Sequence, residues 1–284
     1  RSLSHNAGLP DARTIDIYLA ALARLIAPDL SEVNLKSFGL AEDALELCAQ
    51  IPAQGLEAAI NEVGTASGAL SGLKLHPTLA IRHAGGQLFQ EAHFELLRVS
   101  PDSDLFGLID APETKSVIRG GTHFTPPALA RSIVEQVLVN FADLATRSQL
   151  VLSDPACGSG AFLHEALRAL RRAGFEGRLT LIGIDTSFAA IAMARFVLSQ
   201  SIRDWSPQGG VELRLILGDS LGATGMPKSD IIVMNPPFIA FGAQSVEQRQ
   251  QLRDATDMTA ARGDYSMAFV ARALDALKKG GVLG

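Results

Sequence analysis

The stretch that most constrains the fold is a glycine-rich turn between an apolar run and a helical pattern. It reads Asp154-Pro155-Ala156-Cys157-Gly158-Ser159-Gly160, with apolar residues 150–152 before it and apolar residues at helical spacing over 162–170 after it. A strand, a glycine turn and a helix form the βα unit that places backbone N–H groups against a nucleotide-like ligand. Glycine there permits unusual φ values and close backbone approach. The spacing is neither G-x-G-x-x-G nor a Walker loop, so the turn alone indicates only a cofactor site.

Beyond this turn, apolar strands alternate with helices. The pattern predicts strands over 150–154, 179–184, 213–217 and 231–234, and each ends at or leads to a polar residue: Asp154, Asp185, Asp219 and Asn235. Such strands are typical of a buried parallel sheet with its chemistry at the carboxyl edge. We therefore expect an α/β fold with a doubly wound, Rossmann-like sheet, in which the first and fourth strands are neighbours. A final helix, predicted to be capped by Asp264, carries the residues Tyr265, Phe269, Leu274 and Leu277 and closes with Lys278-Lys279-Gly280.

Residues 1–118 are expected to form a helical N-terminal region. Apolar residues at i, i+3, i+4 and i+7 predict an amphipathic helix before Pro28, and similar patterns cover 40–51, 56–63 and 88–99. His83 and His93 lack a ligand pattern around them and are interpreted as solvated or core histidines. Pro101-Asp102 and Glu113-Thr114-Lys115 match the loose pattern of metal-dependent nucleases, but no alternating strands flank them. We favour a surface linker there and expect no metal site.

Composition excludes several classes of protein. Apolar residues make up 47% of the chain and charged residues 19%, which excludes global disorder. The sequence contains no apolar run of membrane-spanning length and no signal peptide, and Cys48 and Cys157 do not suggest a disulfide framework, so we expect a cytoplasmic protein without a membrane partner. The net charge of −5 argues against strong nonspecific DNA binding by this chain alone, although a local basic face remains open.

Two further stretches add chemistry. In Gly120-Gly121-Thr122-His123-Phe124-Thr125-Pro126-Pro127, Thr125 is predicted to cap a helix that has Pro126 at its first position, and the N–H groups there could receive a carboxylate. In Asn235-Pro236-Pro237-Phe238, the prolines stiffen the strand exit, so the Asn235 side-chain oxygen and the Pro236 carbonyl can both accept from one NH₂ group. Two such acceptors make the lone pair of a planar NH₂ group available, and Phe238 offers a face for stacking. A proline turn with a buried Phe238 is the simpler alternative.

These motifs resemble motifs X, I and IV of the γ-class N6-adenine DNA methyltransferases, an order shared by type I modification subunits and type IIG enzymes. The resemblance covers about residues 118–284. It implies a class I methyltransferase domain over 119–284, with S-adenosylmethionine as cofactor. The cofactor-binding residues implied are Thr125, Pro126, Asp154, Ala156, Gly158, Gly160, Phe162, Asp185, Asp219 and Asn235. Asp185 would bind the ribose, Asp219 with Phe162 or its neighbours the adenine, and Thr125 and Asp154 would lie near the methionine end.

The resemblance also implies a reaction. Asn235, Pro236, Pro237 and Phe238 would hold a target adenine flipped out of DNA, and the methyl group would pass directly to its N6 atom without metal or covalent intermediate. The expected system is restriction–modification or phage defence, with a specificity or recognition subunit or domain as a further partner. Two alternatives stay open: a methyltransferase of glutamine amides or RNA bases, and a non-catalytic cofactor-binding subunit.

The chain also departs from the family pattern. Only four strands and the start of a fifth of the family's seven-stranded sheet are recognisable, and no target-recognition domain is visible. Because the chain begins at Arg1 and stops at Gly284, where a strand should be starting, we expect a catalytic-core fragment with the C-terminal strands missing. Residues 239–262 form a long connection with three arginines, interpreted either as a loop over the substrate or as a solvated helix over 245–254.

Overall fold

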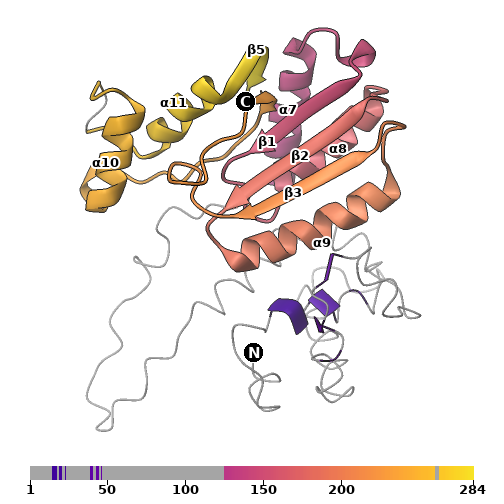
Figure 1. The fold of residues 1–284 in the computed structure, drawn as a ribbon, viewed down its shortest axis with the longest axis horizontal. Coiled ribbons are helices and arrows are strands. Elements are labelled where there is room, and N and C mark those ends of the chain that lie inside the picture. Colours follow the sequence, from indigo (N-terminus) through magenta and orange to yellow (C-terminus); the bar gives the residue numbers. More distant parts are fainter. Residues whose placement is uncertain are drawn as a thin grey trace.

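The computed structural model describes residues 125–259 and 262–284, together with residues 15–17, 19, 20, 23, 39, 40, 43, 44 and 46 of the N-terminal region. The main part of the chain alternates helices and strands (Figure 1). In chain order the elements are α7 (Pro127–Asn140), η4 (Leu144–Thr146), β1 (Gln149–Asp154), α8 (Ala161–Arg172), β2 (Arg178–Asp185), α9 (Phe188–Asp204), β3 (Val211–Leu217), β4 (Ser229–Ile232), η5 (Phe241–Ala243), α10 (Val246–Ala255), α11 (Ser266–Ala276) and β5 (Leu277–Leu283).

The described strands form one parallel, five-stranded sheet in the order β3-β2-β1-β4-β5. The chain moves outward from β1 through β2 to β3, then crosses back to β4 on the other side of β1. Leu152 pairs with Ile231 across that junction, which confirms the predicted β1–β4 neighbourhood. Figure 1 shows the arrowheads of β1, β2 and β3 at one edge of the sheet. Ligands bind at this edge of a doubly wound sheet, beside the point where the strand order reverses.

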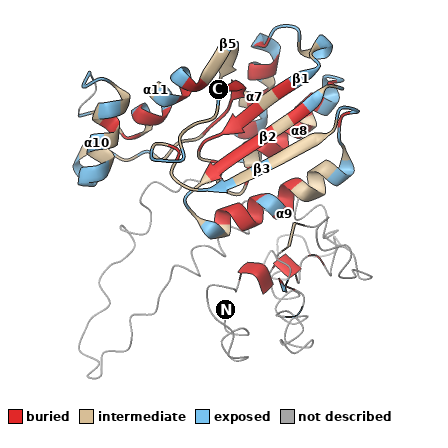
Figure 2. Cartoon of the chain, viewed as in Figure 1, coloured by how far each residue is buried: buried red, intermediate tan, exposed pale blue. Residues whose placement is uncertain are grey.

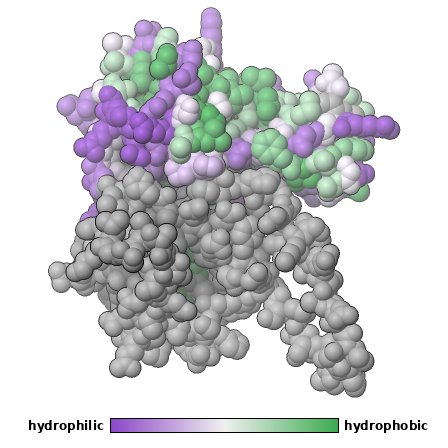
Figure 3. Space-filling view, turned by 180° about the vertical axis from the view of Figure 1, so that it is seen from behind, coloured by the Kyte–Doolittle hydropathy of each residue, from purple (hydrophilic) through white to green (hydrophobic). Residues whose placement is uncertain are grey.

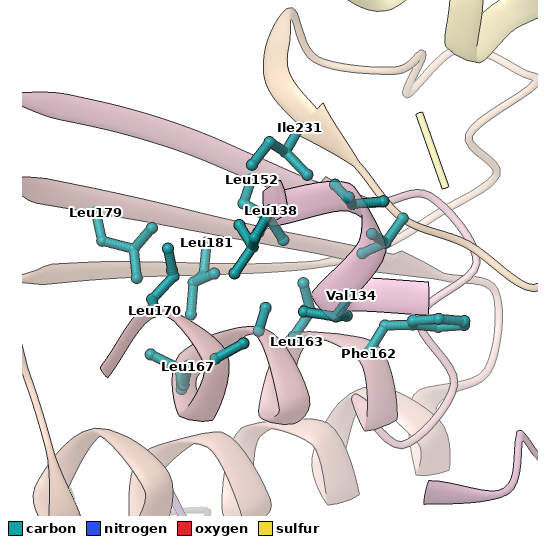
Figure 4. Packing of buried hydrophobic residues seen from close by; sticks show 14 of the residues in the cluster. Val134, Leu138, Leu152, Phe162, Leu163, Leu167, Leu170, Leu179, Leu181 and Ile231 are labelled. Atoms are coloured by element: carbon teal, nitrogen blue, oxygen red, sulfur yellow. The ribbon is translucent and has the colours of Figure 1, made fainter. Parts of the chain in front are cut away.

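Alternation along the strands divides the core between the two faces of the sheet. On one face, Leu150 and Leu152 of β1 and Ile231 of β4 pack with the apolar sides of α7 and α8. Figure 4 shows Leu152 and Ile231 there in close-up. On the other face, Ile232 packs with Phe269 and the rest of the buried side of α11. Figure 2 shows β1 and β2 largely buried and β3, at the edge, only partly so. Because helices cover both faces of the sheet, the inner strands are apolar along nearly their whole length.

Helix α7 starts one residue later than predicted. Pro126, not Thr125, is the N-cap of α7, Pro127 is the first helical residue, and the cap makes no side-chain hydrogen bond. The Thr125 hydroxyl contacts Asn235 instead. Val134, Val137 and Leu138 on the inner face of α7 lie in the core.

The last helix ends earlier than predicted. α11 stops at Ala276, and the Lys278-Lys279-Gly280 stretch lies within β5 rather than at a helix C-terminus. Leu277 pairs with Ser229 of β4, and Lys278 donates to the Asp230 carboxylate at 2.9 Å. These sheet contacts override the local helix signal. Leu274, one of the apolar residues that this helix carries, is 58% exposed.

The connection after β4 contains the predicted helix. α10 begins after Ser245, whose hydroxyl accepts from Gln248 N while the Gln248 side chain accepts from Ser245 N, a complete capping box. The solvated-helix interpretation of residues 245–254 is thus confirmed. Only Leu252 of α10 is buried, because the helix packs on α11 with one side and faces solvent with the rest.

Part of the N-terminal region packs against α9. Residues 15–17, 19, 20 and 23 are helical, and Ile15 and Leu19 contact Met193 and Phe196 of α9. The predictions for residues 56–63, 88–99, His83, His93 and the nuclease-like residues 101–115 lie outside the described residues.

The surface seen from behind mixes hydrophilic and apolar side chains over the described part (Figure 3). An ion pair joins α7 to α8, between Arg172 and Glu135 at 2.8 Å. Within the described ranges, none of the helices combines the length and apolar character that a membrane span requires. The same ranges contain no cluster of three or more His, Cys, Asp or Glu side chains arranged to hold a metal ion.

Candidate functional site

The glycine turn is held against β2 by its own backbone. Cys157 N donates to Ile184 O at 2.9 Å, and Gly158 N donates to the Asp185 carboxylate at 2.9 Å. Both glycines adopt positive φ, 52° at Gly158 and 85° at Gly160, which an L side chain rarely does. A Cβ atom at Gly158 would meet nothing within 4 Å, so the turn presents bare backbone to open space. Gly160, in contrast, is the N-cap of α8 and packs near Leu198.

Asp154 is a buried acid at the end of β1. Its side chain is 1% exposed, and its Oδ1 atom accepts from Ala156 N at 3.0 Å. Burial raises the pKa of Asp154 to about 8; the hydrogen bond from Ala156 opposes this shift, and the nearby Asp185 charge adds to it. The carboxyl group is therefore mostly protonated at neutral pH. A cation next to it would favour its ionised form.

Asp185, the last residue of β2, joins two turns through its carboxylate. One oxygen accepts from Gly158 N, and the other accepts from Ser187 N at 2.8 Å. Ser187 in turn caps α9 by accepting from Ala190 N. Each carboxylate oxygen has a second acceptor site, so the side chain can accept hydroxyl hydrogen bonds while it holds the glycine turn.

Asp219 follows β3 and connects the sheet edge to α10. One of its oxygens accepts from Leu221 N at 2.9 Å, and the other accepts from Gln251 Nε2 at 2.6 Å. The Gln251 carbonyl accepts from the Tyr265 hydroxyl at 2.5 Å. Burial, with the charge of Asp219, raises the pKa of Tyr265 to about 12, so the phenol stays a donor. The hydrogen bonds from Tyr265 to Gln251 and from Gln251 to Asp219 thus connect the segment after Asn235 to the end of β3.

A neighbouring bond ties the same turn to the glycine loop. The buried Ser220 hydroxyl donates to Pro155 O at 2.6 Å. The turns after β1, β2 and β3 are therefore linked to one another, and the polar residues that follow these three strands form one continuous edge.

Asn235 lies at the same edge. Val233 N donates to Ser153 O of β1 at 3.0 Å and Met234 N to Gly284 O at 3.1 Å, so the backbone leading to Asn235 stays in the sheet although β4 itself ends at Ile232. The Asn235 amide donates to Thr125 Oγ1 at 3.0 Å, which brings the segment before α7 to the segment after β4.

Phe238 is exposed. Its ring is 54% accessible, so the alternative of a buried Phe after a proline turn is wrong. Pro236 and Pro237, which separate Asn235 from Phe238 in the sequence, are partly buried. The segment therefore offers a rigid backbone with a free aromatic face at its end.

Hydrogen bonds join the two ends of the segment from Ile239 to Tyr265. The buried Gln244 side chain donates to Ile239 O at 2.8 Å and to Gly263 O at 2.9 Å, and Tyr265 N also donates to Ile239 O. Arg249 of α10 stacks on Phe241 with 4.7 Å between the guanidinium carbon and the ring centre. These contacts give the connection a defined shape beside Asn235.

The structure brings most of the expected site residues together, but not all. Asp154, Ala156, Gly158, Asp185, Asp219, Asn235 and Thr125 are linked by the bonds described above. Phe162 is 3% exposed and lies in the core among Leu163 and its neighbours (Figure 4), and Pro126 is exposed at the start of α7. Sequence reasoning missed Ser220, Gln244, Gln251 and Tyr265 as residues that shape the edge. Only Ser220, directly after Asp219, carried a local signal.

A parallel sheet in the order β3-β2-β1-β4-β5, with a glycine turn after β1 and helices on both faces, has the topology of the class I methyltransferase-like fold. The chain belongs to the N-6 DNA methylase family, whose model matches residues 108–284, well over half of the sequence. The match includes the Thr125, Asp154–Gly160 and Asn235–Phe238 segments.

Several solved structures resemble the chain. The type IIG restriction endonuclease BpuSI matches with a TM-score of 0.58 and 13% identity, over 100% of this chain and 33% of BpuSI. A Listeria monocytogenes protein assigned to the class I S-adenosylmethionine-dependent methyltransferases gives 0.48 and 14%, over 95% and 64%. A type I restriction-modification methyltransferase subunit from Streptococcus thermophilus gives 0.44 and 17%, over 95% and 73%. The BpuSI match supports the fold, and the chain spans less than two thirds of BpuSI and of the Listeria protein.

Proposed function

We propose that this protein transfers a methyl group from S-adenosylmethionine to N6 of an adenine in DNA, within a restriction–modification or phage-defence system. The observation that carries the proposal is the meeting of three separate segments at one sheet edge. The pairing of β1 with β4 sets the glycine turn and Asn235 on neighbouring strands, and the 3.0 Å bond from Asn235 joins Thr125 to them.

The residues at this edge fit such a cofactor. Gly158 presents backbone to open space, as a ligand lying on the turn requires. Asp185 retains acceptor capacity for ribose hydroxyls, and Asp219 for an adenine amino group. The buried Asp154 carboxyl suits the cationic methionine end, since ionisation next to a cation is favoured. When bound, the cofactor supplies an electrophilic methyl group.

The acceptor side would work through two neutral oxygens. The Asn235 side-chain oxygen and the Pro236 carbonyl each accept one N–H of the adenine amino group. These two hydrogen bonds favour a geometry in which the nitrogen lone pair is no longer delocalised into the ring. The nitrogen pair forms the new N–C bond while the methyl–sulfur bond breaks. Neither oxygen is basic enough to take a proton at neutral pH, so one N–H proton leaves to water after transfer.

The target base has to leave the duplex to reach this edge. The ring of Phe238 is exposed three residues after Asn235 and would stack on the base held there. DNA is therefore the proposed substrate, and recognition of its sequence is proposed to come from a specificity subunit or domain.

Asn235→Ala tests the proposal. We expect calorimetry to give cofactor affinity within about twofold of the wild type, while tritium transfer from labelled cofactor to DNA falls by about 100-fold or more, as for loss of a preorganised polar group. Asn140→Ala is the matched control, because Asn140 is exposed at the end of α7 and bonds only within its helix. Full transfer by Asn235→Ala would refute the role of Asn235. Label found in RNA or in protein amides instead would select the alternative substrates, and binding without any transfer by the wild type would indicate a non-catalytic subunit.

A further inference from the structure

We propose that Thr125 is a positioning residue that holds the Asn235 carboxamide by its NH₂ group, which leaves the carboxamide oxygen to face the target amine. The inference rests on the proposed function and assigns a role to a residue outside the Asn-Pro-Pro-Phe segment.

The first observation is that the Thr125 hydroxyl serves the site rather than its own helix. Thr125 stands directly before the N-cap of α7, and threonine near a helix start commonly accepts from the helix backbone. In this protein the cap makes no side-chain bond. The hydroxyl, on a side chain only 8% exposed, accepts from Asn235 Nδ2 at 3.0 Å. In place of a capping bond within its own helix, the Thr125 hydroxyl thus makes a hydrogen bond to a segment 110 positions away.

The second observation is that both partners sit on rigid supports. Thr125 is carried by α7, whose Val134 and Leu138 lie in the core beneath the sheet (Figure 4). Asn235 is carried by backbone that donates to Gly284 and is followed by two prolines. With both ends held, the hydrogen bond between the two side chains fixes where the carboxamide lies.

The third step is the chemistry of the amide. A carboxamide has a donor end and an acceptor end of nearly equal shape. With the NH₂ end on Thr125, the oxygen is left to accept from the adenine amino group. A reversed carboxamide would set NH₂ against NH₂, donor against donor, and the two-acceptor arrangement would be lost. Thr125 therefore acts through Asn235 and need not touch the base.

The experiment compares Thr125→Val, which keeps the shape but removes the hydroxyl, with Thr125→Ser, which keeps it. At saturating cofactor we expect Thr125→Val to lower kcat by about 2- to 12-fold, the range for loss of one neutral hydrogen bond. Thr125→Ser should stay within about twofold of the wild type. Thr146→Val serves as control, because Thr146 is exposed and bonds only to Asp143. A Thr125→Val enzyme that loses cofactor affinity but keeps its kcat would overturn the inference, since the hydroxyl would then serve the cofactor alone.

A readout without turnover separates this inference from the proposed function. The Asn235 side-chain NH₂ resonances, identified by their absence in Asn235→Asp, should exchange with water more slowly than those of the exposed Asn140. Thr125→Val should remove that protection. If the wild type transferred no methyl to DNA, the proposed function would fail, yet this exchange would still decide whether Thr125 holds Asn235. Unchanged protection in Thr125→Val would overturn the inference whatever the activity.

Discussion

The pKa of Asp154 leads to a direct test of the cofactor site. Because burial raises this pKa to about 8, the side chain is mostly neutral at pH 7 in the free protein. A cofactor with a positively charged methionine end would bind the ionised form more tightly. Raising the pH through 8 should therefore increase the affinity of the wild-type protein, and Asp154→Asn should abolish this increase.

The size of the effect follows from the fraction of ionised Asp154. That fraction is about one hundredth at pH 6, about one tenth at pH 7 and about nine tenths at pH 9 for a pKa near 8. If the bound form is ionised throughout, affinity rises by on the order of 90-fold from pH 6 to pH 9, or about 2.7 kcal/mol. Titration of the cofactor's own amino group affects wild type and variant alike and cancels in their ratio.

The assay is calorimetric titration of S-adenosylmethionine at unit steps of pH, with Asp154→Asn measured in parallel. The ratio of the two affinities should rise nearly tenfold per pH unit up to about pH 8 and then level off. A ratio independent of pH would refute the placement of Asp154 next to the cationic end of the cofactor.

The same pKa predicts the pH dependence of folding. An unfolded aspartate has lost its proton above about pH 4, whereas folded Asp154 keeps it up to about pH 8. Between these values the folded state binds more protons, so the free energy of unfolding decreases as the pH rises, by up to about 1.4 kcal/mol per unit from this group. Urea unfolding of Asp154→Asn should lack this contribution. Equal slopes for the two proteins would contradict the raised pKa.

Two further predictions concern the target base and the opposite edge of the sheet. Phe238→Ala should weaken transfer to DNA by about 1–3 kcal/mol, and Phe238→Tyr by less, because tyrosine keeps the stacking face; equal losses in single-turnover transfer would exclude stacking. Asp230 accepts from Val151 N, Lys278 and Arg147 at the start of β4. Asp230→Ala should lower the free energy of unfolding by about 2–4 kcal/mol without changing cofactor affinity, since the partly buried donors lose their acceptor far from the site. Exposed Glu212→Ala, which removes only the pair with Arg214, should cost at most about 1 kcal/mol; a similar loss in both would contradict the role of Asp230.

The strands could be predicted because their signals are local. Apolar runs that end in Asp154, Asp185 and Asn235 mark buried parallel strands, and the glycine turn marks the first of them. The observed bounds differ by one or two residues for most strands.

Contacts between distant segments could not be predicted. The Lys278-Lys279-Gly280 stretch resembles a helix end, but pairing with β4 makes it a strand. Thr125 resembles a helix cap, but its hydroxyl accepts a hydrogen bond from Asn235 instead. Gln251 carries no signal by itself, since its importance comes from Asp219 and Tyr265, which reach it only in the folded chain.

The central claim is that the Asn235 edge methylates the exocyclic nitrogen of adenine. The most direct measurement is mass spectrometry of nucleosides from DNA incubated with the wild-type protein and deuterium-labelled cofactor. We predict labelled N6-methyldeoxyadenosine, formed about 100-fold more slowly, or slower still, by Asn235→Ala. Label on cytosine, or equal labelling of adenine by Asn235→Ala, would contradict the account.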